Sequence, residues 1–137
     1  MARSTAYLKT YRVGRKLRLK DIDPGARPAA SSSREADDAR LAELAIEIDR
    51  LQDLLYANGS AGRPPKLLLV LQGMDTSGKD GTARSVFRQC SPLGVRVAAF
   101  KAPTEVERAH DFLWRVHAVA PRAGEVVVFN RSHYEDV

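Results

Sequence analysis

The residues best suited to chemistry lie in a glycine-rich stretch between Gly73 and Thr82, which reads Gly-Met-Asp-Thr-Ser-Gly-Lys-Asp-Gly-Thr. Gly73, Gly78 and Lys79 fit the G-x-x-x-x-G-K pattern of a phosphate-binding loop (P-loop). Glycines let successive backbone N–H groups turn toward one anion, and the lysine adds a full positive charge. The spacing therefore predicts phosphate binding. The alternative is a glycine-rich turn without a ligand, which the preceding apolar strand and the lysine argue against.

Two acidic residues distinguish this loop from the common pattern. Asp80 follows the lysine, where such loops usually carry a Ser or Thr that holds magnesium, and Asp75 lies inside the loop. A carboxylate beside polyphosphate is repelled unless a cation lies between them. We therefore expect Asp75 to bind Mg²⁺ in place of the missing hydroxyl, with Thr82 as a weaker candidate. The full set of expected phosphate or nucleotide contacts in the loop is Gly73, Met74, Thr76, Ser77, Gly78, Lys79, Asp80, Gly81 and Thr82.

A second polar run, residues 130–136, reads Asn-Arg-Ser-His-Tyr-Glu-Asp and follows an apolar segment. Arg131 offers a planar fork of N–H donors that suits phosphate oxygens, although an ion pair with a nearby carboxylate is an alternative. Asn130 can orient a metal-bound water but cannot neutralise a cation, so Asp136 is a second metal candidate beside Asp75. Lys101 follows another apolar segment and either contacts phosphate or is a solvated loop lysine.

The hydrophobic pattern predicts strands at 67–71, 95–100 and 125–129, with the first fully buried, and helices at 34–56, 79–89 and 104–119. Strands that alternate with helices indicate an α/β fold, with a parallel sheet and helices on both faces. Ligands of such sheets bind at the carboxyl ends of the strands, which is where the candidate residues lie. We expect a capping box at Ser32 and Glu35 to begin the first helix. Its apolar face is expected to comprise Leu41, Leu44, Ile48, Leu51 and Leu55, packed on its own domain or, as the second choice, on a partner helix.

The bulk composition is that of one globular domain, with 137 residues and a net charge of +5. Seven Lys or Arg residues precede the first acid, Asp21, and we interpret residues 1–33 as a solvated basic arm ahead of a domain over 34–137 whose leading helix spans 34–57. A basic balance suits anionic partners such as nucleotides or polyphosphate, and no motif indicates specific nucleic-acid recognition. No apolar run has membrane-spanning length, and a cytoplasmic protein is expected.

These motifs resemble those of the polyphosphate kinase 2 family. The resemblance is carried by residues 73–82 and 130–136, and residues 19–24, 100–104 and 110–114 also match. It implies a Mg²⁺-dependent transfer of a terminal phosphate between inorganic polyphosphate and an adenine or guanine nucleoside mono- or diphosphate. In that chemistry Lys79 would hold the transferring group, Asp75 would place the metal, and Arg131 would stabilise charge on the phosphate oxygens. We also expect a homo-oligomer.

This sequence departs from the family pattern in two respects. Many members have Asp at the position of Asn130, and members continue past Val137 with further strands and a basic lid. We therefore expect an incomplete P-loop-kinase-like domain whose third strand, 125–129, is an exposed edge. Two alternatives to the phosphotransferase stay open: a truncated phosphate-binding or assembly fragment without catalysis, and a nucleoside or nucleotide kinase.

Overall fold

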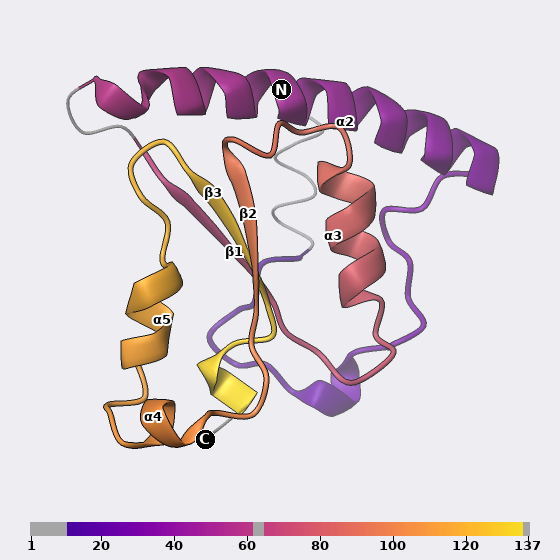
Figure 1. The fold of residues 1–137 in the computed structure, drawn as a ribbon. Helices are drawn as coiled ribbons and strands as arrows, with labels where there is room; N and C mark the ends of the chain where they lie inside the picture. Colours follow the sequence, from indigo (N-terminus) through magenta and orange to yellow (C-terminus); the bar gives the residue numbers. More distant parts are fainter. Residues whose placement is uncertain (1–10, 62–64, 136–137) are drawn as a thin grey trace. The chain divides into compact units, whose positions relative to one another are not determined.

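The computed structural model describes residues 11–61 and 65–135, and it divides the chain into two compact units, Met1–Arg40 and Leu41–Val137 (Figure 1). In the first unit, residues 11–33 are exposed and largely irregular apart from the short helix η1, Leu19–Asp21. An aspartate turn in which Asp23 Oδ1 accepts the Gly25 N–H (2.8 Å) interrupts any longer helix there. The residues 1–10 of the predicted basic arm lie outside the described part.

Helix α2, Arg34–Ala57, runs from the first unit into the second. Its cap differs by one residue from the predicted capping box, because the hydroxyl of Ser33, not Ser32, accepts the backbone N–H of Ala36 (3.2 Å). Ala36 has no side-chain acceptor to return that bond, so the reciprocal box is absent at this end.

The face that α2 buries is rotated from the predicted one. Ala45 and Gln52 are the most buried residues of the helix, whereas the predicted Leu44 and Leu51 are 40% and 51% exposed. The other three predicted residues are half-buried: Leu41, Ile48 and Leu55. Spacing alone finds the apolar stripe but not its centre, because a polar side chain, Gln52, lies on the helix face that packs.

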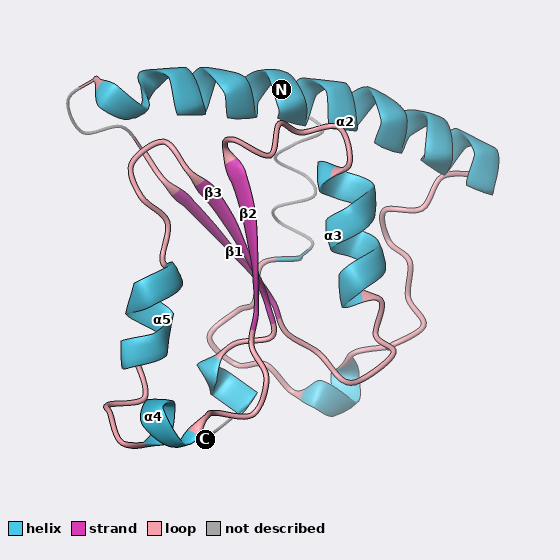
Figure 2. Cartoon of the chain, in the orientation of Figure 1, coloured by secondary structure: helices cyan, strands magenta, loops and turns pink. Residues whose placement is uncertain are grey.

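The sheet has three parallel strands in the order β1-β3-β2 (Figure 2), which confirms the α/β fold class. The strands are β1, Leu67–Leu71; β2, Val95–Ala99; and β3, Val126–Asn130. The predicted third strand is thus the centre of the sheet and not its exposed edge, and its residues 126–129 are at most 4% exposed. Crossover connections allow a later strand to insert between two earlier ones, and sequence order does not reveal this.

The strand β1, predicted to be fully buried, is one of the two edges of the described sheet. Leu67, Leu68 and Val70 are 52%, 40% and 40% exposed. A continuous apolar run is typical of a strand covered on both faces, but among the described residues β1 has a strand neighbour on one side only.

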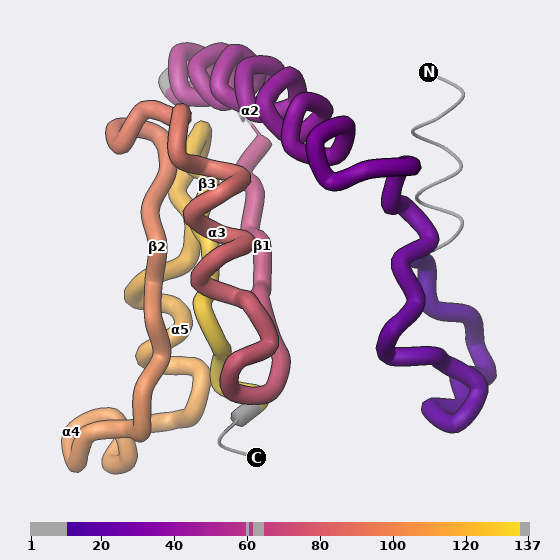
Figure 3. The backbone as a smooth tube through the Cα atoms, turned by 90° about the vertical axis from the view of Figure 1, so that its right-hand side faces the viewer, coloured from indigo at the N-terminus to yellow at the C-terminus, as the bar shows by residue number. Residues whose placement is uncertain are grey.

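Helices cover both faces of the sheet. Helix α3, Lys79–Phe87, lies on the face opposite α5, Trp114–Val119, as the two views agree (Figures 1 and 3). The core under α5 joins its Val116 and Val119 to Phe100, Val127 and Phe129. Helix α3 ends two residues before the predicted Gln89, where residues 88 and 89 form a turn ahead of Pro92.

The helix predicted over 104–119 is two shorter helices, α4, Glu105–Arg108, and α5. A capping box begins α4, since the Thr104 hydroxyl accepts the Glu107 N–H (3.2 Å) and Glu107 Oε2 accepts the Thr104 N–H (2.7 Å). Asp111 separates the two helices because its carboxylate accepts the Leu113 N–H (2.9 Å). Consequently no single helix runs through this segment, and Phe112 between the two helices is 59% exposed.

The remaining short elements are the 3₁₀ turns η2, Asn58–Ser60, and η3, His133–Glu135. No helix within the described ranges has the length and hydropathy needed to cross a membrane.

The C-terminal half of α2 contacts the loops that lead into β2 and β3. A Cβ added at Gly94 would lie 1.7 Å from Gln52 Nε2 and 3.2 Å from Tyr56 Cβ, and one at Gly124 would lie 2.7 Å from Gly59 Cα. At Gly124 the neighbouring atoms are backbone, including Leu55 O of α2 at 3.1 Å, so only glycine permits that approach, whereas at Gly94 the nearest atom is the end of the Gln52 side chain. The end of the helix thus packs against the amino ends of the strands, at the opposite end from the candidate site.

We predict that Gly94→Ala lowers the free energy of unfolding by about 1–3 kcal/mol, because Gln52 must leave its buried position. Urea denaturation measures the change. Gly81→Ala is the matched control, since an added Cβ there meets nothing within 4 Å. Equal stability of Gly94→Ala and the wild type would contradict the close packing of α2.

Candidate functional site

The candidate residues surround a cavity of about 540 Å³ at the carboxyl ends of the strands. Its walls come from the loop between β1 and α3, from the residues that follow β2, and from the end of β3. The pairing of Leu71 and Ala99 with Asn130 brings these three segments level. The lining residues that the sequence singled out are Asp75, Thr76, Ser77, Gly78, Lys79, Asp80, Gly81, Lys101, Asn130 and Arg131.

The loop is closed around the ammonium group of Lys79. Lys79 Nζ donates to the carbonyls of Gly73 (2.6 Å) and Met74 (2.7 Å), and it lies 3.3 Å from Ser77 Oγ. Gly78 has a φ of 89°, which a side chain would strain, and this turn directs the chain into α3. A bound anion would therefore compete with two backbone carbonyls for the lysine.

The second polar run meets the loop through two side-chain pairs. Arg131 Nη2 donates to Asp75 Oδ1, and Asn130 Nδ2 donates to Asp80 Oδ1. The ion-pair alternative for Arg131 is therefore what the structure shows, with the predicted metal ligand as its partner. Asp75 remains 83% exposed in this pair, so its carboxylate is accessible to a cation from solvent.

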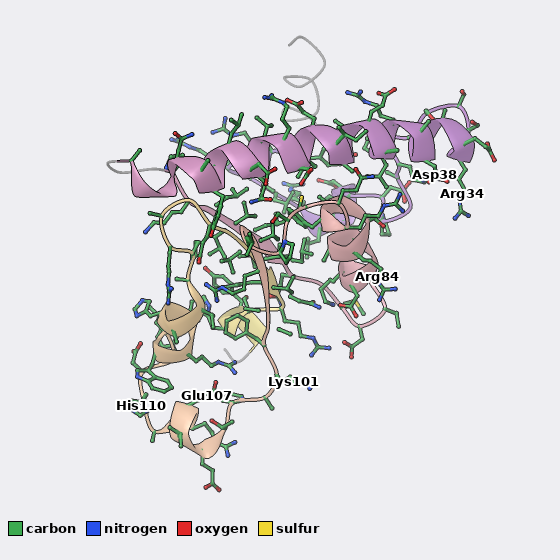
Figure 4. All side chains as sticks on the ribbon, turned by 45° about the horizontal axis from the view of Figure 1, so that its top comes forward. Arg34, Asp38, Arg84, Lys101, Glu107 and His110 are labelled. Atoms are coloured by element: carbon green, nitrogen blue, oxygen red, sulfur yellow. The ribbon has the colours of Figure 1, made fainter. Side chains whose placement is uncertain are left out.

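The position of Lys101 depends on a residue that the sequence reasoning missed. Arg115 on α5 donates from Nη1 to the Lys101 carbonyl (2.8 Å), and its guanidinium lies 5.2 Å from the Phe100 ring centroid. Arg115 is 9% exposed, so its hydrogen bond anchors the backbone of the segment after β2 to α5. Figure 4 shows Lys101 on that segment. An arginine inside an otherwise apolar helical stretch was the available signal, since a charge on a buried face needs partners.

Glu107 of α4 lies 3.9 Å from Arg115 Nη1. Its pKa is lowered, first by the hydrogen bond from the Thr104 backbone N–H, then by the Thr104 hydroxyl and by Arg115, against a rise from desolvation. Because the pKa of Glu107 is lower in the folded state, its contacts with Thr104 and Arg115 together stabilise the fold at pH values above the ordinary glutamate pKa. The contribution is lost as the pH falls through the lowered pKa.

Three of the expected loop contacts do not line the cavity: Gly73, Met74 and Thr82. Gly73 and Met74 contribute their carbonyls to Lys79, while the Met74 side chain is 85% exposed. The Thr82 N–H donates to the Gly78 carbonyl (2.8 Å) in the first turn of α3. Asp136, the second metal candidate, lies outside the described residues.

Comparison with known proteins gives a consistent family assignment. A family model described as polyphosphate kinase 2 matches residues 31–137. The chain is 52% identical over 133 residues to an AMP/ADP-polyphosphate phosphotransferase of Meiothermus ruber, covering 95% of this chain and 48% of the relative. It is 37% identical over 91 residues to a GDP-polyphosphate phosphotransferase of Mycolicibacterium smegmatis, covering 66% of this chain and 30% of the relative.

The fold is also that of a solved structure, polyphosphate kinase 2 from Arthrobacter aurescens. The TM-score is 0.88 at 44% sequence identity, over 94% of this chain and 46% of that one. The chain thus spans about half the length, or less, of the relatives that it matches.

Because Asp75 is paired with Arg131, we expect Asp75 to oppose the binding of anions when no metal ion is present. Asp75→Asn should raise the affinity for inorganic tripolyphosphate in EDTA roughly fivefold, because a carboxylate that repels the anion and competes for Arg131 is removed. Titration calorimetry measures the affinity. Asp38→Asn removes the same charge from outside the cavity and controls for net charge. A weaker affinity of Asp75→Asn would show that Asp75 does not oppose the anion.

Proposed function

Because this chain belongs to the polyphosphate kinase 2 family, we propose that it provides the phosphate-binding part of a phosphotransferase. The proposed reaction moves a terminal phosphate between inorganic polyphosphate and a nucleoside mono- or diphosphate. The observation that carries the proposal is the meeting of Lys79 from the loop and Arg131 from the second motif across one cavity. Three residues with cationic side chains, Lys79, Lys101 and Arg131, line the cavity together with two aspartates, which favours an anionic ligand.

In this proposal the protein acts by position and charge. Lys79 would turn from the loop carbonyls to the oxygens of the transferring group, and the loop N–H groups would hold its neighbours. Arg131 would leave Asp75 and place its planar donors on the equatorial oxygens, where negative charge develops during transfer. No side chain needs to form a covalent bond to phosphorus.

The residues present fit a magnesium ion. Mg²⁺ is usually bound by one or two carboxylates together with substrate phosphates, and Asp75 and Asp80 both line the cavity. Within residues 11–61 and 65–135 there is no group of three or more His, Cys, Asp or Glu side chains able to hold a metal. We therefore propose that Asp75, assisted by Asp80, holds Mg²⁺ only together with phosphate. The bound ion would supply charge neutralisation and orientation of the phosphates.

The nucleotide, the assembly and the location are also proposals. The AMP/ADP name of the Meiothermus ruber relative supports adenine nucleotides as acceptors, with ATP as a product, and the GDP name of the mycobacterial relative keeps guanine nucleotides open. Leu44, Leu51 and Leu54 on α2 are each at least 40% exposed, which supports a homo-oligomer. Nucleotide and Mg²⁺ substrates would suit a cytoplasmic location.

The proposed site is tested by thermal stability. Mg²⁺ with tripolyphosphate should raise the melting temperature, since a ligand that binds only the folded state stabilises it. Lys79→Ala should remove most of this shift, and Lys66→Ala, which replaces an exposed lysine ahead of β1, should retain it. An equal shift in wild type and Lys79→Ala would exclude the loop as the site.

If Asp75 binds Mg²⁺, the effect of Asp75→Asn on tripolyphosphate affinity should reverse when Mg²⁺ is added. With Mg²⁺ present, Asp75→Asn should weaken tripolyphosphate binding, the opposite of its effect in EDTA, because the carboxylate then bridges to phosphate through the ion. The measurement is the affinity across a magnesium titration. The same gain in affinity with and without Mg²⁺ would contradict the metal role of Asp75.

Activity is tested in two proteins: this chain, and this chain completed with the unmatched residues of the Meiothermus ruber relative. We expect the completed protein to form ATP from ADP and polyphosphate, and Lys79→Ala to abolish that activity. Little or no ATP formation by the 137-residue chain itself would agree with a phosphate-binding part that is not catalytic alone. A completed protein that folds and binds polyphosphate but makes no ATP would contradict the proposed reaction.

A further inference from the structure

A buried serine joins the two motifs of the cavity. The Ser132 hydroxyl donates to Gln72 Oε1 (2.9 Å) and accepts the Tyr134 N–H (3.2 Å). Ser132 is 2% exposed, although it follows the half-exposed Arg131 directly. Gln72 is the residue between β1 and the phosphate-binding loop. The hydrogen bond therefore connects the entry to the loop with the residue that follows the arginine.

Arg131 has an unusual backbone that these contacts fix. Its φ is 66°, in the left-handed region that side chains other than glycine rarely adopt, and such conformations persist only where the surroundings determine them. On one side, the Arg131 N–H donates to Leu71 O (3.0 Å) and Asn130 O accepts the Phe100 N–H (3.1 Å). On the other side, the first side-chain anchor is the Ser132 hydroxyl.

We propose that Gln72 and Ser132 form a latch that sets the direction of the Arg131 side chain, which makes both of them positioning residues for phosphate binding. With the latch closed, the left-handed backbone directs the guanidinium over the loop, where it meets Asp75. Without the latch, Arg131 can relax to an ordinary conformation and its side chain leaves the loop. This inference rests on the proposed function, since the arginine is useful only if the cavity binds phosphate.

The latch is tested by titration calorimetry of the 137-residue chain with Mg²⁺-tripolyphosphate. Ser132→Ala and Gln72→Leu should each weaken binding roughly three- to tenfold, the range expected for the loss of one hydrogen bond. Ser132→Thr, which keeps the hydroxyl, should restore binding. Ser91→Ala should bind like the wild type, because the Ser91 hydroxyl accepts the Leu93 N–H (3.3 Å) in the loop before β2.

A double-mutant cycle separates positioning from general support of the fold. Lys79 and the loop N–H groups should leave measurable binding in Arg131→Ala. If the latch acts through the arginine, Ser132→Ala should cause no further loss in that background. An equal loss in both backgrounds, or full affinity of both latch variants, would overturn the inference. Gln72→Leu, at an exposed residue, serves in the cycle if Ser132→Ala does not fold.

The outcomes also distinguish the latch from the proposed function. If the wild type does not bind tripolyphosphate, or if Lys79→Ala binds equally well, the proposed function fails and the latch fails with it. If Lys79→Ala loses binding while both latch variants bind like the wild type, only the latch fails.

Discussion

The parallel pairing of β3 with both of its neighbours is the interaction on which the cavity depends. Asn130 stands level with Leu71 on one side and Ala99 on the other. The ladder continues past the strand ends, where Arg131 donates to Leu71 O and Phe100 donates to Asn130 O. A slip of one residue in either pairing would turn the side chains of that strand to the opposite face. Side chains on both faces of β3 are buried, and a slip in either pairing would also displace the residues at the strand ends that line the cavity.

Two cations of the cavity have partners within the protein that an anionic ligand would have to displace. Lys79 is bound by carbonyls and Arg131 by Asp75, so each cation has a partner that an anion can replace. Of the two contacts, the Arg131–Asp75 pair joins two charges and is partly exposed, where ion pairs contribute about 0–1 kcal/mol. The binding energy of an ordinary phosphate ligand is therefore large enough to displace these protein partners from Lys79 and Arg131. The same contacts hold both cations at the site.

The sequence predicted which residues meet at the cavity better than it predicted the elements that hold them. The loop, Arg131 and Asn130 were found because their chemistry depends on residue types at fixed local spacings, and the first and last bounds of β1 were predicted correctly. The order of the strands was not predicted correctly. The position of β3 between β1 and β2 depends on how the crossover connections run, and no local sequence pattern contains that information. Arg115 and the bond between Gln72 and Ser132 were missed for the same reason: their partners are 14 and 60 residues away.

The two ends of the sheet have opposite physical characters. At the amino ends, glycines allow α2 and the turn η2 to approach the loops before β2 and β3 closely, so this end is packed tightly. At the carboxyl ends, polar loops surround an accessible cavity, and their conformation is kept by individual hydrogen bonds from Lys79, Arg115 and Ser132. Close packing at one end lets the fold tolerate exchangeable polar contacts at the other. A substitution at the amino ends should therefore act on stability and one at the carboxyl ends on binding, and this separation is what allows the role of a single hydrogen bond in the cavity to be measured.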